Sequence, residues 1–82
     1  METLAALRPG QKGRIVAVEG DDAVALRLLE MGLTEGEEVS MLGYAPLGDP
    51  IEFSVRGYRV SLRGAEAERV HVELVGPAEA VE

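Results

Sequence analysis

One stretch of the chain, residues 22–36, has the apolar spacing of an amphipathic helix. At about 100° per residue, a broad sector collects five apolar side chains: Val24, Ala25, Leu28, Leu29 and Met31. Arg27 and Glu30 fall on the opposite, polar sector, and Leu26 falls outward with them. The pattern predicts one helix that lies across another structure and buries only one side.

Both ends of this helix carry recognisable signals. Asp21 or Asp22 can cap the first turn, because a carboxylate accepts hydrogen bonds from the unpaired N–H groups there. Gly32 stands where the residue after a helix adopts a left-handed conformation, which glycine does without steric cost.

Five further segments have the β-branched runs or the alternation typical of strands: Lys12–Glu19, Glu37–Ala45, Ile51–Val55, Tyr58–Leu62 and Val70–Leu74. Gly43 in mid-strand predicts a bulge or a sharp bend, and Arg56-Gly57 predicts a two-residue hairpin turn. The alternation places both Phe53 and Tyr58 on the inward face.

Five short strands in 82 residues cannot form two full sheets, and an open sheet would expose its edges. We therefore predict a mainly β fold, a five-stranded SH3-like barrel with one helix between its first and second strands. A short turn at Leu4–Leu7 is expected to tuck under the barrel. The predicted domain covers residues 1–76, followed by a disordered acidic tail at residues 77–82.

The composition argues against several classes of function. The formal net charge of −7 argues against nucleic-acid and anionic membrane-surface binding. With no cysteine there is no thiolate chemistry, and no apolar run is long enough to span a bilayer. The N-terminus lacks the pattern of a secretory signal, so a cytoplasmic location is expected.

Catalytic and metal-binding constellations are not evident. The serines lack a histidine and acid arranged around them, and there is no phosphate-binding glycine loop. His71 stands alone on an outward strand position, where a surface residue is more common than a metal ligand. The acidic groups lack the spacing of a defined cation loop. We expect no catalytic residue, no metal site and no cofactor.

The segment Pro46–Pro50 is the most unusual part of the predicted surface. Two prolines around Leu47, Gly48 and Asp49 forbid regular strand pairing. Either it is a rigid turn, or it is a preformed recognition loop with Leu47 exposed at its tip.

The helix offers two more candidate contacts. Arg27 suits an ion pair with an acidic residue of this chain or of a partner, and Leu26 is an outward leucine. The candidate partner-binding residues are Leu26, Arg27, Leu47, Gly48, Asp49 and Pro50.

Two blocks in combination carry a family resemblance. They are the run Arg27-Leu28-Leu29-Glu30-Met31-Gly32-Leu33 and the loop Ala45-Pro46-Leu47-Gly48-Asp49-Pro50. With these motifs the chain resembles the ferrous iron transport protein A (FeoA) family over about residues 3–75. The resemblance implies an SH3-like barrel in the bacterial cytoplasm. It also implies an accessory, non-catalytic role beside FeoB, a ferrous iron permease with a cytoplasmic GTP-binding domain.

Two alternatives stay open. One is a different SH3-like adaptor, although three aromatic residues are few for a peptide groove and the negative charge opposes RNA. The other is a weak metal-binding carrier. Exposed barrel edges leave a homodimer open without predicting one.

Overall fold

The computed structural model describes residues 1–75, so the acidic tail predicted at residues 77–82 lies outside the described residues. The elements in chain order are β1 (Glu2–Thr3), the 3-10 turn η1 (Leu4–Ala6), β2 (Lys12–Val18), α1 (Ala23–Glu30), β3 (Glu38–Tyr44), β4 (Ile51–Val55), β5 (Tyr58–Leu62), α2 (Gly64–Ala67) and β6 (Val70–Val75). The mainly β class and the position of the helix are confirmed.

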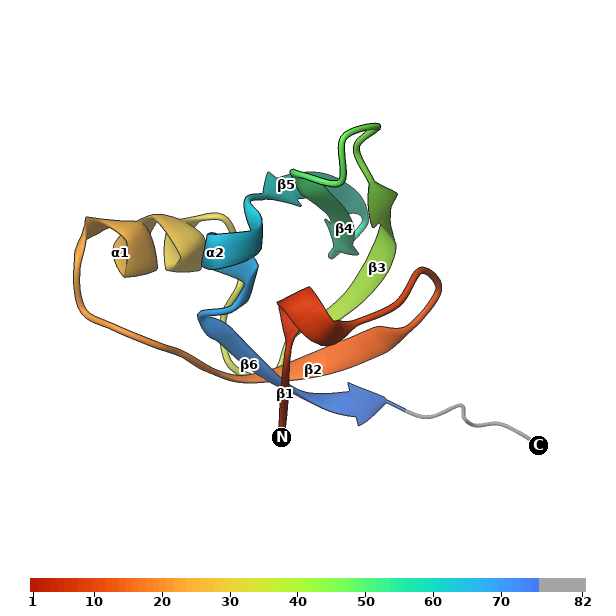
Figure 1. Ribbon diagram of the computed structural model, residues 1–82. Helices are drawn as coiled ribbons and strands as arrows, with labels where there is room; N and C mark the ends of the chain where they lie inside the picture. Colours follow the sequence, from red (N-terminus) through yellow and green to blue (C-terminus); the bar gives the residue numbers. More distant parts are fainter. Residues whose placement is uncertain (76–82) are drawn as a thin grey trace.

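The strands form one antiparallel sheet in the order β1-β6-β2-β3-β4-β5. The sheet curls strongly around an interior, with β4 and β5 on one side, β1 and β6 on the other, and η1 and α2 between them (Figure 1). The prediction of five strands was one short. The sixth, β1, has only two residues, and it is defined by its pairing with β6 rather than by any pattern of its own.

The interior of the curl is filled by aliphatic side chains around Phe53, which is fully buried. Leu4, the first residue of η1, and Leu7, which follows η1, are also buried there, as the sequence predicted. Gly13 is needed where β2 crosses β6, because a Cβ at that position would lie 2.8 Å from Val72 Cγ2. No polar or charged side chain of the described residues is buried.

Two local predictions in the strands are confirmed. The register between β3 and β4 shifts between Met41 and Gly43, which is the predicted bulge. Arg56 and Gly57 both have positive φ, 55° and 89°, which is the pattern of the tight turn favoured in two-residue hairpins.

Tyr58 is on the predicted inward face of the sheet, opposite the buried Val55, but it is not buried. Its side chain is 46% exposed, and its hydroxyl donates to the main-chain carbonyl of Met31 at 2.7 Å. Because Tyr58 is the first residue of β5, it lies beyond the end of the core and reaches the helix instead.

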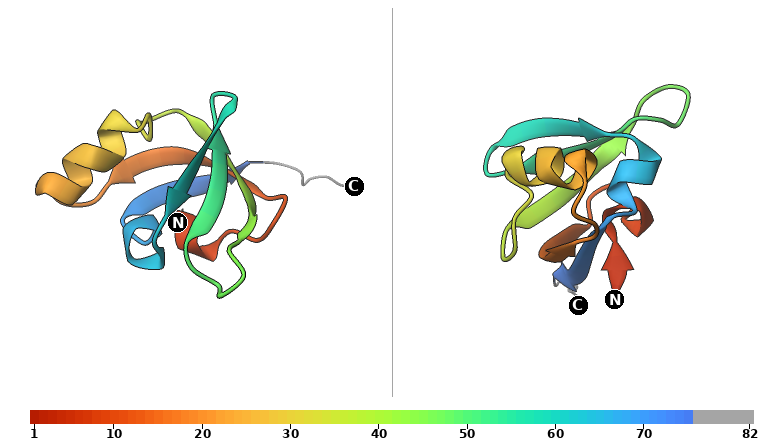
Figure 2. Two further views of the ribbon diagram at one scale, coloured as in Figure 1. Left: turned by 90° about the horizontal axis from the view of Figure 1, so that it is seen from above. Right: turned by 90° about the vertical axis from the view of Figure 1, so that its left-hand side faces the viewer.

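Helix α1 lies at one end of the molecule, outside the curl of the sheet (Figure 2). Asp22 caps it by accepting a hydrogen bond from Ala25 N at 3.1 Å. Gly32 has φ 96°, and Leu33 N donates to the Leu28 carbonyl at 3.2 Å, which is the closing bond of a Schellman motif. Both predicted end signals are therefore confirmed.

The helix buries a narrower face than predicted. Ala25 and Leu28 are buried, but Leu29 is 42% exposed. The barrel covers only one side of α1, and Leu29 lies at the margin of that side. No helix among residues 1–75 is long and apolar enough to cross a membrane.

Candidate functional site

The loop between β3 and β4 is held in shape by its own backbone. Ala45 N donates to the Pro50 carbonyl at 2.9 Å, which closes the base of the loop. Gly48 N donates to the Ala45 carbonyl at 2.7 Å, and Gly48 has φ 91°, so the tip is a glycine-dependent turn. Leu47 stands at this tip with 96% of its surface exposed.

Asp49 joins this loop to the start of α2. Its carboxylate accepts a hydrogen bond from Gly64 N at 2.7 Å and another from Arg63 Nη1 at 3.1 Å. The bond from Gly64 N, and after it the Arg63 guanidinium, lower the pKa of Asp49. The carboxylate therefore stays ionised and anchors the loop at neutral pH.

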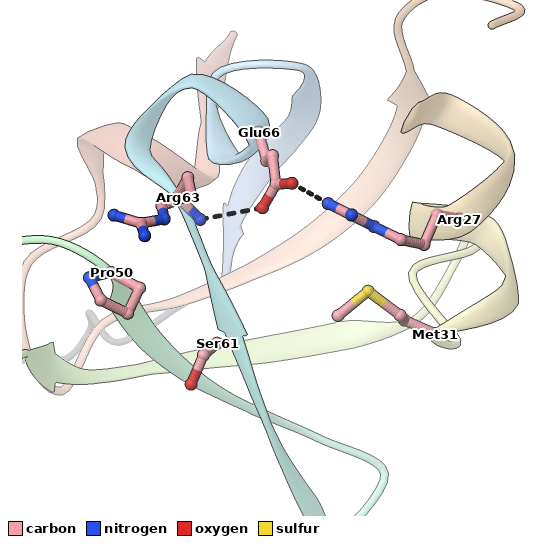
Figure 3. Close-up of a pocket in the computed structure, with 6 residues that line it drawn as sticks. All are labelled: Arg27, Met31, Pro50, Ser61, Arg63 and Glu66. Carbon is pink, nitrogen blue, oxygen red and sulfur yellow. Dashed lines mark hydrogen bonds and ion pairs between the residues drawn. The ribbon is translucent and has the colours of Figure 1, made fainter. Parts of the chain in front are cut away.

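A shallow groove of about 460 Å³ lies between α1, α2 and β5 (Figure 3). It is lined by Arg27, Met31, Pro50, Ser61, Arg63 and Glu66. Glu66 is central, because its carboxylate accepts from Arg63 N at 2.9 Å and also forms an ion pair with Arg27. The Glu66 side chain is only 18% exposed, whereas the Arg27 side chain is 56% exposed.

Three of the six candidate residues meet around this groove. Arg27 and Pro50 line it directly, and Asp49 reaches its edge through Arg63. Leu47 and Gly48 belong to the same loop but form its exposed tip. The candidate residues of the loop and Arg27 therefore share one side of the molecule.

Leu26 does not join them. It lines a second hollow, of about 410 Å³, beside the first turn of α1. The reason is helical geometry, since side chains of neighbouring residues project about 100° apart. Leu26 and Arg27 consequently mark opposite edges of the exposed face of α1.

Four residues of the groove were not among the candidates from the sequence: Met31, Ser61, Arg63 and Glu66. One signal was available for the last two, because an acidic residue three positions after the start of a turn is typical of a helix N-terminus. Helix α2, at Gly64–Ala67, begins at this signal. No local pattern could show that Glu66 also meets Arg27, which is 39 positions earlier in the sequence.

The other ion pairs mainly hold elements of the fold together. Arg69 binds both oxygens of Asp22, at 2.7 and 2.9 Å, and so ties the start of α1 to the segment before β6. His71 Nε2 lies 3.1 Å from Glu19 Oε1. Among residues 1–75, no three His, Cys, Asp or Glu side chains converge in a group that could hold a metal ion.

Comparison with known proteins agrees with this architecture. The model of the FeoA domain matches residues 2–74. A fusion protein of Fe(2+) transport protein A and Fe(2+) transporter FeoB, from Porphyromonas gingivalis strain W83, is 39% identical over 72 residues. That match covers 88% of this chain but only 8% of the fusion protein.

Two solved structures have the same fold. The solution structure of an FeoA-like protein from Clostridium acetobutylicum has a TM-score of 0.83 and 32% identity, over 90% of this chain and 86% of that one. The crystal structure of FeoA from Stenotrophomonas maltophilia, an SH3-domain protein complexed with zinc, has a TM-score of 0.78 and 36% identity. That match covers 89% of this chain and 91% of the Stenotrophomonas maltophilia protein.

The curled antiparallel sheet thus has an SH3-like fold, and the family model extends across nearly every described residue. The chain belongs to the FeoA family, which is linked to ferrous iron transport.

Proposed function

We propose that this protein is a non-catalytic accessory module of bacterial ferrous iron uptake that docks, in the cytoplasm, on the GTP-binding domain of an FeoB-type permease. The observation that carries the proposal is the Porphyromonas gingivalis relative, in which the corresponding segment belongs to a fusion with the Fe(2+) transporter FeoB. A transporter and a module that occur in one polypeptide are held close together, which favours a contact that also forms between separate chains.

The loop 45–50 is the central contact in this proposal. Its two internal hydrogen bonds and the anchoring of Asp49 to α2 fix its shape before any partner arrives. A preformed loop loses little conformational entropy on binding, so more of the contact energy becomes affinity. Leu47 supplies an apolar side chain that is almost fully exposed and could be buried by a partner.

Arg27 extends the contact surface along the groove. Glu66 occupies only part of its guanidinium, which has five N–H donors, and more than half of the side chain remains exposed. A carboxylate of the partner can therefore bind Arg27 without breaking the internal ion pair. Gly48 and Pro50 shape the loop between these two contacts. Leu26, at the other edge of α1, supplies a separate apolar contact with the same permease.

The test is calorimetric titration with the purified GTP-binding domain of the same organism's permease, without nucleotide, with GDP and with a GTP analogue. We expect binding in at least one state and its loss on Leu47→Asp. Leu74→Asp is the matched control, because Leu74 is also exposed, at 54%, but lies on β6. Absence of binding in every state, or equal effects of the two variants, would contradict the proposal.

A further inference from the structure

The hollow beside α1 is a second surface, separate from the groove and the loop. It is lined by Gly20, Asp21, Asp22, Ala23, Ala25, Leu26 and Leu29. Its walls are mainly apolar, because Leu26 and Leu29 are three positions apart on the helix and are 57% and 42% exposed. An exposed pair of leucines beside a hollow is typical of a surface that another chain covers.

Two carboxylates near this hollow have no counter-charge among the described residues. Asp21 lines the hollow, and Glu30 directly follows Leu29 on α1. Both are exposed, and neither takes part in an ion pair among the described residues. Two arginines lie near α1, but Arg69 is paired with Asp22, and Arg27 is paired with Glu66 and lines the groove instead of this hollow. The apolar surface is therefore bordered by carboxylates that lack a counter-charge.

We infer that this surface, Leu26 and Leu29 with the carboxylates of Asp21 and Glu30 near them, binds an amphipathic basic helix of a partner protein. Aliphatic side chains of that helix enter the hollow, and Lys or Arg side chains beside them pair with Asp21 and Glu30. Apolar burial gives the affinity, and the two carboxylates select the charge of the occupant.

The geometry favours a helical occupant over an extended one. An extended segment satisfies its main-chain groups by pairing with a sheet edge. The hollow runs along α1, whose main-chain groups are paired within the helix, so it offers no such edge. A helix satisfies its own hydrogen bonds and can lay one apolar face against two turns of α1.

The same charges disfavour two other occupants. A second copy of this chain with the same face would bring Asp21 and Glu30 against like charges. An anionic lipid surface would meet the same repulsion.

The inference rests on the proposed function only for the source of the helix. Cytoplasmic segments next to transmembrane helices are rich in Lys and Arg, so a membrane transporter has basic segments of this kind. A contact there would hold this protein against the membrane-proximal part of its partner while loop 45–50 contacts the GTP-binding domain.

The test uses the full chain and a defined probe. The probe is a fluorescein-labelled helical peptide with two repeats of LKKLLKL, and its control has every lysine replaced by glutamate. Binding is followed by fluorescence anisotropy at physiological salt, and the site is mapped by amide chemical shifts of the ¹⁵N-labelled protein. We expect the lysine peptide to bind and to shift residues 20–30, and the glutamate peptide not to bind.

Matched variants separate a specific site from general attraction to an acidic protein. Asp21→Lys with Glu30→Lys should weaken binding by at least about tenfold. Glu2→Lys with Glu73→Lys changes the net charge equally, on β1 and β6, and should change the affinity by less than about twofold. Leu26→Gln should weaken binding about as strongly as the charge reversal, and Leu74→Gln, at another exposed leucine, should not.

Equal effects of the two charge reversals, equal effects of the two leucine variants, or shifts outside residues 20–30 would overturn the inference. Binding of the GTP-binding domain is measured separately. If that domain binds but the peptide results are negative, the inference fails alone. If the peptide binds at α1 as described but the domain does not bind, the proposed function fails and the inference stands.

Discussion

The hydroxyl of Tyr58 donates a hydrogen bond of 2.7 Å to the main-chain carbonyl of Met31. This bond joins the β4–β5 hairpin to the C-terminal end of α1, where the last carbonyls have no partner within the helix. The same hydroxyl is close to the place that a Cβ at position 32 would take, so any side chain there would collide with it. The C-terminal end of α1 and the β4–β5 hairpin therefore pack closely together at this point.

Removal of the Tyr58 hydroxyl tests how much this hydrogen bond stabilises the protein. Tyr58→Phe should lower the free energy of unfolding by about 1 kcal/mol, because it leaves the Met31 carbonyl without its donor while the ring stays in place. Urea denaturation measures the change. Tyr44→Phe is the matched control, since Tyr44 is similarly exposed, at 52%, and should change the stability by less than about 0.5 kcal/mol. Equal losses in the two variants would show that the hydrogen bond adds no stability.

Gly32→Ala should cost more than the same substitution at Gly36. Both glycines have φ above 90°, so each alanine carries the left-handed strain of about 1–3 kcal/mol. Only position 32 also faces an obstacle, because a Cβ at Gly36 has no neighbour within 4 Å. The difference between the two variants should shrink when Tyr58→Phe is added, which a double-mutant cycle by urea denaturation would measure. An unchanged difference would exclude the collision with the hydroxyl as its cause.

Gly13→Ala should destabilise the protein by about 1–3 kcal/mol, because the new methyl group is forced against Val72 in a filled interior. Gly43→Ala serves as the control, since a Cβ there meets nothing within 4 Å. Thermal unfolding followed by circular dichroism compares the two. Val72→Ala, made in the Gly13→Ala protein, should cost less than in the original protein. If Gly43→Ala is as damaging as Gly13→Ala, the close approach of β2 to β6 is not the cause.

The stability should depend on Asp22 below pH 4. The hydrogen bond from Arg69, and after it the bond from Ala25 N, lower the pKa of Asp22 from 3.8 to about 2. A carboxyl group with a lowered pKa in the folded state stabilises the protein above its unfolded pKa, and that contribution is lost as the pH falls from about 3.8 to about 2. Asp22→Asn keeps a residue that can cap α1 but removes the titration.

Urea midpoints measured between pH 2 and pH 7 would test this. The decline of the midpoint between pH 4 and pH 2 should be shallower in Asp22→Asn than in the original protein. Asp21→Asn is the control, since the neighbouring Asp21 has no ion pair among the described residues, and it should leave the slope nearly unchanged. Parallel pH profiles for all three proteins would rule out the proposed role of Asp22.

The sequence by itself determined the features of the fold that depend only on residues close together in the chain. Gly32 and Asp22 mark the ends of α1 because left-handed backbone and unpaired N–H groups are local needs. Gly43 and the Arg56-Gly57 turn were predicted for the same reason, and alternation in β4 placed Phe53 in the interior. These features together were enough for the mainly β class.

Only the tertiary structure decided which surfaces meet. Glu66 contacts Arg27, and Asp49 contacts Gly64, across long separations that no periodicity encodes. Tyr58 alternates like a core residue but lies past the end of the core, and β1 exists only because β6 is beside it. Leu26 and Arg27 are neighbours in the chain, yet on α1 Arg27 lines the groove and Leu26 lines the hollow. Local patterns reveal how each segment folds, whereas contacts between distant segments depend on how the whole sheet curls.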